Sequence, residues 1–337
     1  MGPIMLDVEG YEISPEEKDI LDHPLVGGII LFSRNYHDQL QLKALVTELR
    51  KNARNDVLIA VDHEGGRVQR FRDGFSAIPA MGSLCSKDEN LTERILAQST
   101  TFGWLMAAEL LAFDIDMSFA PVLDIHGISD VVGDRSFHQN SQHVISLAGA
   151  FIQGMHNAGM KCTGKHFPGH GNVKEDSHVA MPVDSRSKEE IFQLDMTIFD
   201  KLNQQGLLDA VMPAHVIYPD VDSLPAGFSP TWVGQILRKQ LGFNGVVFTD
   251  DLSMQGAVQL GSIVERVKTG LNAGCDMALV CNSPKDAAQA IDGLPSDYTS
   301  TGRAKSMRKG QVLDFQQLRK TDKYQQALKT LGEFCEA

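Results

Sequence analysis

The feature that most constrains the fold of this sequence is a series of eight short apolar runs spread along most of the chain. They cover residues 4–8, 26–32, 56–62, 115–124, 160–166, 208–215, 245–250 and 275–281. Most are apolar at consecutive positions rather than at alternate ones, which is typical of strands buried on both faces. Strands of this kind belong to parallel sheets covered by helices, so the runs predict an α/β fold.

Helix signals stand between these runs. The segment 14–17 (SPEE) combines an N-cap serine, a proline at the first helical position and a glutamate at the third. Residues 187–190 (SKEE) repeat the spacing of serine and glutamate. Two more helix starts and two helix ends are indicated at Ser229-Pro230, Ser283-Pro284, Gly159 and Gly274.

Polar residues close many of the apolar runs, namely Asp62, Asp124, Lys165, His166, His215, Asp250 and Asp251. In a closed barrel of parallel strands the carboxyl ends converge on one mouth, whereas in an open sheet they spread along an edge. No Gly/Ser/Pro linker separates two halves. We therefore predict a single-domain (β/α)8 TIM barrel over residues 1–337, with a C-terminal helical tail from about residue 311. A doubly wound open sheet is the alternative.

Composition and charge narrow the class of protein. The net charge of −12 argues against binding to nucleic acid or to an anionic membrane surface. The acidic N-terminal segment does not have the pattern of a signal peptide, and the five scattered cysteines indicate reduced thiols, so we expect a cytoplasmic protein. The basic segment 303–309 (RAKSMRK) is expected to lie on a solvated loop or helix face.

Three histidines, His166, His170 and His178, fall close together in the segment GKHFPGHGNVKEDSH. A P-loop is rejected, because histidine replaces the required Ser/Thr after Gly-Lys and the segment is itself a predicted strand. A metal site is disfavoured, because His166 and His170 are separated by Phe-Pro-Gly and therefore do not share a helical face. The metal-dependent barrel hydrolase nevertheless stays open as an alternative.

The third interpretation is acid/base chemistry without a metal. Asp176 stands two residues before His178 and can accept a hydrogen bond from one ring nitrogen, leaving the other nitrogen to exchange a proton. Asp250, at the end of its strand, would face the barrel mouth as a carboxylate nucleophile. An acid/base group and a carboxylate nucleophile together are what retaining glycoside hydrolysis requires. The competing interpretation of Asp176 is a simple turn cap.

The motifs as a set resemble glycoside hydrolase family 3. KHFPGHG followed by DSH, with DHEGGRVQR upstream and TDDLSM downstream, is similar to the single-domain branch of that family, the cytoplasmic bacterial β-N-acetylglucosaminidases of peptidoglycan recycling. The resemblance covers nearly the whole chain, from LDVEGYEIS to GCDMALVCN. His63 departs from the pattern, since a relative can carry glutamine there.

The resemblance implies a role for each matched residue. His178 matches the acid/base, Asp176 its partner and Asp250 the nucleophile, while Asp251 would be structural or orienting. Because adjacent strand residues point in opposite directions, only one of the two aspartates is expected to face the mouth. Five further positions match residues that bind the sugar: Asp62, Arg70, Arg135, Lys165 and His166.

The function that follows is a retaining exo-β-N-acetylglucosaminidase acting on terminal N-acetylglucosamine, with 1,6-anhydro-N-acetylmuramyl peptides of cell-wall recycling as the substrate that the resemblance implies. No cofactor and no metal are implied, the partner is a small glycan, and a monomer is expected. A phosphorylase on the same barrel is an alternative within enzymes. A sugar-binding barrel without catalysis is the alternative outside them.

Overall fold

A computed structural model describes residues 1–86, 90–174, 181–296, 298, 300–310 and 314–336 of this chain. Eight parallel strands form a barrel in the order β6-β3-β2-β1-β12-β11-β8-β7. Each predicted apolar run contributes one strand. The strands are β1 (Ile4–Asp7), β2 (Val26–Leu31), β3 (Leu58–Val61), β6 (Met117–Ser118), β7 (Thr163–Phe167), β8 (Ala210–Pro213), β11 (Val246–Asp251) and β12 (Met277–Leu279).

The pairing closes the sheet. The first strand, β1, pairs in parallel with both β2 and β12, so that Met5 lies opposite Gly28 on one side and Leu279 on the other. The edge strands β6 and β7 meet through the residues that follow β6, where the Thr163 amide donates to the Ala120 carbonyl oxygen (2.8 Å) and Val122 bridges Lys165. The barrel prediction is therefore confirmed, and the open doubly wound sheet is wrong.

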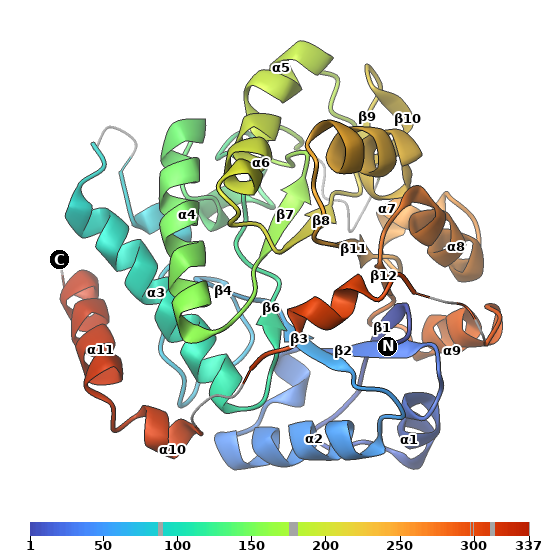
Figure 1. The fold of residues 1–337 in the computed structure, drawn as a ribbon, viewed down its shortest axis with the longest axis horizontal. Helices are drawn as coiled ribbons and strands as arrows, with labels where there is room; N and C mark the ends of the chain where they lie inside the picture. The colour runs from blue at the N-terminus through green and yellow to red at the C-terminus, as the bar shows by residue number, and fades with distance from the viewer. Residues whose placement is uncertain (87–89, 175–180, 297, 299, 311–313, 337) are drawn as a thin grey trace.

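Helices surround the barrel (Figure 1). They are α1 (Pro15–Leu21), α2 (Gln39–Asn52), α3 (Glu93–Ala112), α4 (Ser141–Ala158), α5 (Lys188–Gln193), α6 (Asp195–Gln204), α7 (Gln255–Val258), α8 (Ile263–Ala273), α9 (Pro284–Asp292), α10 (Phe315–Leu318) and α11 (Asp322–Cys335). A π-helix occupies Thr231–Gln240 between β10 and β11. The C-terminal α11 packs against α3, where Tyr324 donates to the buried Glu109 (2.6 Å).

The helix signals act as predicted. Ser14 and Ser187 each form a complete capping box at the start of α1 and α5, and Ser283 caps α9. Gly159 (φ 96°) and Gly274 (φ 116°) end α4 and α8 in the left-handed conformation, which costs a residue without a Cβ least. The helix expected after Ser229-Pro230 is the π-helix rather than an α-helix.

Two hydrophobic layers hold the barrel. Helices and the outer strand faces bury one large cluster, while a second fills the barrel interior with side chains such as Met5, Phe119, Phe248 and Met277. Phe119 and Phe248 meet edge to face, with ring centroids 5.3 Å apart. The interior of the barrel is thus a packed core rather than a pore.

The basic segment 303–309 is solvated on one side and buried on the other. Residues Arg303–Met307 form a 3-10 helix whose Ala304 and Met307 pack into the interior cluster. Arg303 pairs with the buried Asp276 (3.1 Å), and Arg308 lies 3.5 Å from the buried Asp116. Arg303, Lys305 and Ser306 are exposed, as expected for a solvated face. The opposite side of the segment was not predicted, because its cations neutralise aspartates at the amino-terminal end of the barrel.

Two short hairpins interrupt the regular alternation. One joins β4 (His63–Gly65) to β5 (Val68–Gln69), and the other joins β9 (Ile217–Tyr218) to β10 (Asp222–Pro225). Both follow the carboxyl end of a barrel strand, so they extend the mouth. Within the described ranges, no helix has the length and apolar character needed to span a membrane.

Candidate active site

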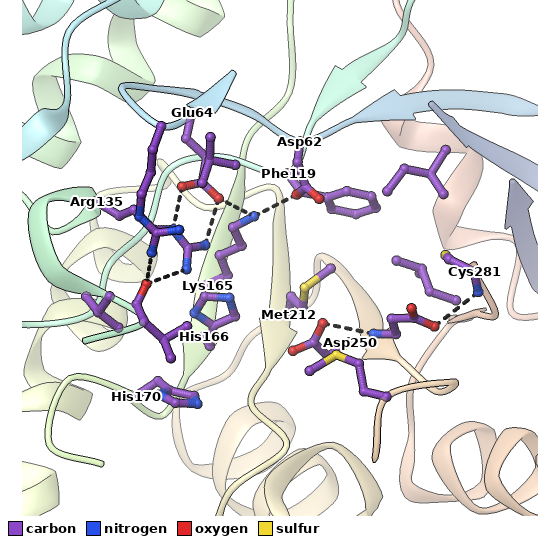
Figure 2. A pocket seen from close by; sticks show the side chains of 18 of the residues that line it. Asp62, Glu64, Phe119, Arg135, Lys165, His166, His170, Met212, Asp250 and Cys281 are labelled. Carbon is purple, nitrogen blue, oxygen red and sulfur yellow. Dashed lines mark hydrogen bonds and ion pairs between the residues drawn. The ribbon is translucent and has the colours of Figure 1, made fainter. Parts of the chain in front are cut away.

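A cavity of about 780 Å³ opens at the carboxyl ends of the strands (Figure 2). Its volume lies within the range of small-molecule sites. Residues from most of the barrel strands or the loops after them border it, including Phe32, Asp62, Glu64, Arg70, Phe119, Arg135, Lys165, His166, His170, Lys174, Met212, Asp250, Asp251 and Asn282. Five of the seven strand-end polar residues singled out in the sequence border this cavity, whereas Asp124 and His215 are fully buried and do not.

An ion-pair network forms one wall of the cavity. Lys165 Nζ lies 2.8 Å from Asp62 Oδ1 and 2.7 Å from Glu64 Oε1. Arg70 Nη2 is 3.3 Å from the other oxygen of Asp62. Arg135 donates two parallel hydrogen bonds of 2.8 Å to the Glu64 carboxylate, from Nε and from Nη2. Four of the five predicted sugar-binding residues therefore lie in one connected group.

The network keeps its members charged. Burial alone would raise the pKa of Glu64, but Arg135 and Lys165 outweigh it and hold the pKa far below its usual range. The same opposition lowers the pKa of Asp62, whose partners are Lys165 and Arg70. Burial acts to lower the pKa of Lys165, yet Asp62 and Glu64 raise it. The wall thus offers both anionic acceptors and cationic donors at neutral pH.

The fifth predicted sugar-binding residue, His166, is held by an aspartate to which the sequence analysis gave no role. The buried Asp124 accepts bonds from the main-chain nitrogen of His166 (3.1 Å) and from its Nδ1 (2.7 Å). A third bond comes from the main-chain nitrogen of His170 (2.7 Å). Because Nδ1 is occupied, the Nε2 atom of His166 is left for a ligand at the cavity, which the residue borders.

Asp250 and Asp251 end strand β11 on a different part of the wall. The Asp251 amide donates to Asp250 Oδ1 (2.8 Å), which fixes the orientation of the Asp250 carboxylate. Asp251 Oδ1 accepts from the Ser253 and Cys281 amides, each at 3.0 Å, and burial raises the pKa of Asp251 to about 6.

Both of these aspartates border the cavity, so the expectation that only one would face the mouth is wrong. The regular alternation ends here because the pairing of β11 with β12 shifts register between Phe248 and Asp251.

The predicted acid/base pair, Asp176 and His178, lies outside the described residues. The segment that carries it starts from the cavity, since His170 and Lys174 both border it. After the undescribed segment, Val183 bridges Ile217 and the Asp184 amide donates to the Ile217 carbonyl oxygen (2.9 Å). Both ends of this loop are thus attached at the mouth of the barrel.

Glu64 was not predicted as a site residue. It follows Asp62 by two residues, the spacing that places side chains on the same side of an extended chain, so the signal was available. Asp124 was placed at the mouth but given no partner, because its contact with His166 spans 42 residues of sequence.

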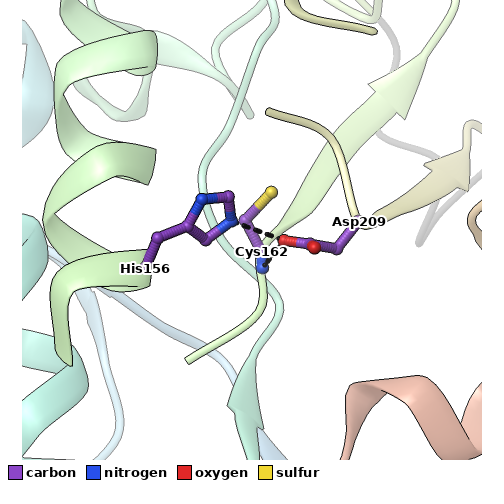
Figure 3. A group of neighbouring side chains, drawn as sticks. All are labelled: His156, Cys162 and Asp209. Carbon is purple, nitrogen blue, oxygen red and sulfur yellow. Dashed lines mark hydrogen bonds and ion pairs between the residues drawn. The ribbon is translucent and has the colours of Figure 1, made fainter. Parts of the chain in front are cut away.

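One cluster of possible metal ligands occurs in the described part of the chain, and it lies away from the cavity. His156, Cys162 and Asp209 (Figure 3) meet where α4 ends and where β7 and β8 begin, at the opposite end of the barrel. His156 Nε2 bonds Asp209 at 2.6 Å, and Lys161 Nζ is 2.8 Å from the same carboxylate. These contacts link a helix to two strands through a hydrogen bond and an ion pair.

Comparison with known proteins agrees with this site. Residues 4–305 match the glycosyl hydrolase family 3 N terminal domain. A protein of Tolumonas auensis named beta-hexosaminidase is 53% identical over 336 residues, which cover 100% of this chain and 99% of that protein.

Solved structures agree as well. NagZ from Neisseria gonorrhoeae in complex with N-trifluoroacetyl-D-glucosamine has a TM-score of 0.92 and 42% identity, covering 99% of this chain and 98% of that one. The same protein in complex with a zinc ion has a TM-score of 0.88 and 40% identity, covering 99% and 98%. This chain therefore belongs to glycosyl hydrolase family 3 and is a glycoside hydrolase.

Proposed function

We propose that this β-hexosaminidase removes a terminal, non-reducing β-linked N-acetylglucosamine with retention of configuration. The observation that carries the proposal is the arrangement of the cavity. A connected group of charged donors and acceptors lines one wall, and a separate oriented carboxylate, Asp250, borders the same space. The complex of the similar Neisseria protein with N-trifluoroacetyl-D-glucosamine supports the choice of sugar.

The charged wall still has bonding capacity for hydroxyl groups. Lys165 has three N–H donors, of which Asp62 and Glu64 take two. Arg135 has five, and its bonds to Glu64 and to the Val131 carbonyl oxygen use three. Asp62 keeps lone pairs that can accept from sugar hydroxyls. Together with Arg70 and His166, these groups bind and orient the sugar through charge-assisted hydrogen bonds.

Asp250 acts as the nucleophile in the first step. One of its oxygens is held by the Asp251 amide, and the carboxylate attacks the anomeric carbon. A bond forms between that carbon and the carboxylate oxygen while the glycosidic C–O bond breaks. Protonated His178, held by Asp176, gives its proton to the departing oxygen. Neutral His178 then takes a proton from water, which hydrolyses the glycosyl-enzyme.

The attachment of the loop supports this role for His178. Lys174 borders the cavity, and four residues of chain reach at most about 14 Å even when fully extended. An imidazole has an ordinary pKa of about 6.5, which suits a group that must give and take a proton near neutral pH.

Several finer points of the proposal come from family resemblance. The natural substrate is an N-acetylglucosaminyl 1,6-anhydro-muropeptide of cell-wall recycling, and the reaction takes place in the cytoplasm. The whole chain acts as one catalytic barrel with a C-terminal helical tail. The enzyme works as a monomer and without a cofactor.

The test is release of nitrophenol from 4-nitrophenyl N-acetyl-β-glucosaminide in phosphate-free buffer with a strong chelator. Undiminished turnover, with the β-configured sugar as the first product by NMR, supports a metal-free retaining hydrolase. Activity that needs a divalent ion would establish the metal-dependent alternative. Activity that needs phosphate, with a sugar 1-phosphate as product, would establish a phosphorylase.

A further inference from the structure

His170 is a buried side chain at the cavity with no role in the mechanism above. It lies in the turn after β7 and borders the cavity, yet only 4% of its surface is exposed. Within the described part of the chain, neither Nδ1 nor Nε2 has a hydrogen-bond partner. Leaving a buried polar group without a partner is unfavourable, so native proteins rarely do so without a functional reason.

The surrounding structure fixes this ring in place. The main-chain nitrogen of His170 donates to Asp124 (2.7 Å), the carboxylate that also holds His166. The rings of His170 and His166 meet edge to face, with centroids 5.9 Å apart. On the preceding residue, the Gly169 carbonyl oxygen accepts from the buried Tyr218 hydroxyl (2.7 Å). The imidazole is therefore preorganised at the cavity wall.

The environment also determines its charge. Burial lowers the pKa of His170, and the neighbouring His166 lowers it further, while Asp124 and Asp250 act in the opposite direction without reversing the shift. A neutral imidazole has one N–H donor and one lone pair. This residue thus differs from the charged wall of Asp62 and Lys165, because it offers a neutral donor and acceptor.

We propose that His170 is a substrate-contacting residue, one of whose ring nitrogens hydrogen-bonds the bound sugar. This inference rests on the proposed function, because it takes the ligand to be an N-acetylhexosamine. Two kinds of group on that sugar match a neutral imidazole, a hydroxyl and the 2-acetamido group. On binding, the sugar satisfies a polar atom that the free protein leaves buried and unpaired.

The test uses three substitutions and a matched control. His170→Phe keeps an aromatic ring without nitrogen, whereas His170→Asn and His170→Gln place an amide near the positions of Nδ1 and Nε2. The control is His63→Phe, since His63 is equally buried and its Nδ1 also lacks a partner among the described residues, but it packs against Phe71 and Phe75 and does not border the cavity.

We would measure kcat/KM on 4-nitrophenyl N-acetyl-β-glucosaminide and inhibition by N-acetylglucosamine. His170→Phe should weaken inhibition and lower kcat/KM by about tenfold or more, the scale of one lost hydrogen bond at a buried site. One of the two amide variants should recover most of the loss. His63→Phe should stay within about twofold of the wild type. The same kcat/KM measurement with 4-nitrophenyl β-glucoside, which has no acetamido group, identifies the group that His170 contacts. If His170 contacts the acetamido group, His170→Phe should not lower kcat/KM on the glucoside. If it contacts a hydroxyl, the reduction should persist.

Some results would overturn the inference. If His170→Phe binds N-acetylglucosamine as the wild type does, the ring contacts no ligand. If His170→Asn and His170→Gln lower kcat/KM as much as His170→Phe does, and all three variants unfold at a lower temperature than the wild type, the ring serves packing. If His170→Phe removes a limb of the pH profile of kcat/KM, the residue transfers protons instead. A wild type that neither hydrolyses the substrate nor is inhibited by the sugar would refute the proposed function itself.

Discussion

Glu64 Oε1 lies 2.7 Å from Lys165 Nζ, and both side chains are only 4% exposed. This pair joins strand β4 to strand β7, and Arg135 also binds the Glu64 carboxylate. A buried ion pair of this kind is stable only while every charge keeps its partner. Glu64 therefore neutralises Arg135 and, together with Asp62, also Lys165 in the wall that is proposed to bind the sugar.

Glu64→Gln should destabilise the protein and weaken binding of the sugar. The change leaves Arg135 without its carboxylate and Lys165 with Asp62 alone, and removing one partner of a buried pair costs about 3–5 kcal/mol in the free energy of unfolding. Urea unfolding at pH 7 measures the loss. The control is Glu48→Gln on α2, whose exposed pair with Lys51 (3.4 Å) should matter by less than about 1 kcal/mol.

The sequence identified the barrel because the signal is local and repeated. Each apolar run covers a single strand, and the alternation with capped helices leaves few ways to arrange eight such units. Strand-end residues such as Asp62 and Lys165 were predictable for the same reason, since a closed barrel brings all carboxyl ends together.

The partners within the site were harder to predict. Contacts such as Asp124 with His166 and Arg135 with Glu64 join residues 42 and 71 positions apart, and periodicity says nothing about such pairs. The pairing of the partly exposed Arg303 with the buried Asp276 was not predicted, because only the closed barrel brings these two residues together. Asp176 and His178 remain predictions of the sequence.

Asp250 and Asp251 are adjacent but should respond very differently to substitution. Asp250→Asn removes the proposed nucleophile and should lower kcat by about 10⁴-fold or more, a scale known for loss of a covalent nucleophile. Asp251→Asn should keep most activity, because one amide oxygen can still accept from the Ser253 and Cys281 amides. Single-turnover kinetics with the 4-nitrophenyl substrate measures the effect of each substitution on the chemical step. A reversal of the two effects would exchange the roles of the aspartates.

The raised pKa of Asp251 predicts how stability depends on pH. The carboxyl titrates at about 6 in the folded protein and near 3.8 when unfolded, so between these values the folded state binds more protons. Its contribution to the free energy of unfolding should therefore fall as pH rises from about 4 to 6, by up to about 3 kcal/mol. Asp251→Asn should remove this dependence. Unfolding curves of the wild type and of Asp251→Asn at pH 4, 5, 6 and 7 test this prediction. It would be contradicted if the free energy of unfolding changed with pH in the same way in both proteins.

Arg186 forms ion pairs with two carboxylates near the end of the loop that carries the proposed acid/base pair. Its guanidinium lies 2.6 Å from Asp184 and 2.7 Å from Asp195, and both carboxylates are almost fully buried. Arg186→Met should lower the free energy of unfolding at pH 7 by about 3–5 kcal/mol. Burial raises the pKa of Asp195 to about 6 even with Arg186 beside it. Asp195 should therefore be protonated at pH 5, where Arg186→Met should lower the free energy of unfolding by less than at pH 7.

Urea unfolding at both pH values measures this effect. The matched substitution Arg54→Met, at an exposed arginine, should change stability by less than about 0.5 kcal/mol at either pH. A loss from Arg186→Met that is equal at pH 5 and pH 7 would show that Asp195 does not take up the proton.

His178→Ala should produce a loss that depends on the leaving group. A general acid matters most when the departing oxygen is basic, so kcat/KM should fall by about 10²-fold or more for a phenyl N-acetyl-β-glucosaminide and much less for a 2,4-dinitrophenyl one. Added azide, which attacks the glycosyl-enzyme without needing a general base, should restore turnover of the dinitrophenyl substrate and give a β-glycosyl azide. Equal losses on both substrates, with no effect of azide, would remove His178 from proton transfer while leaving the role of Asp250 as the nucleophile intact.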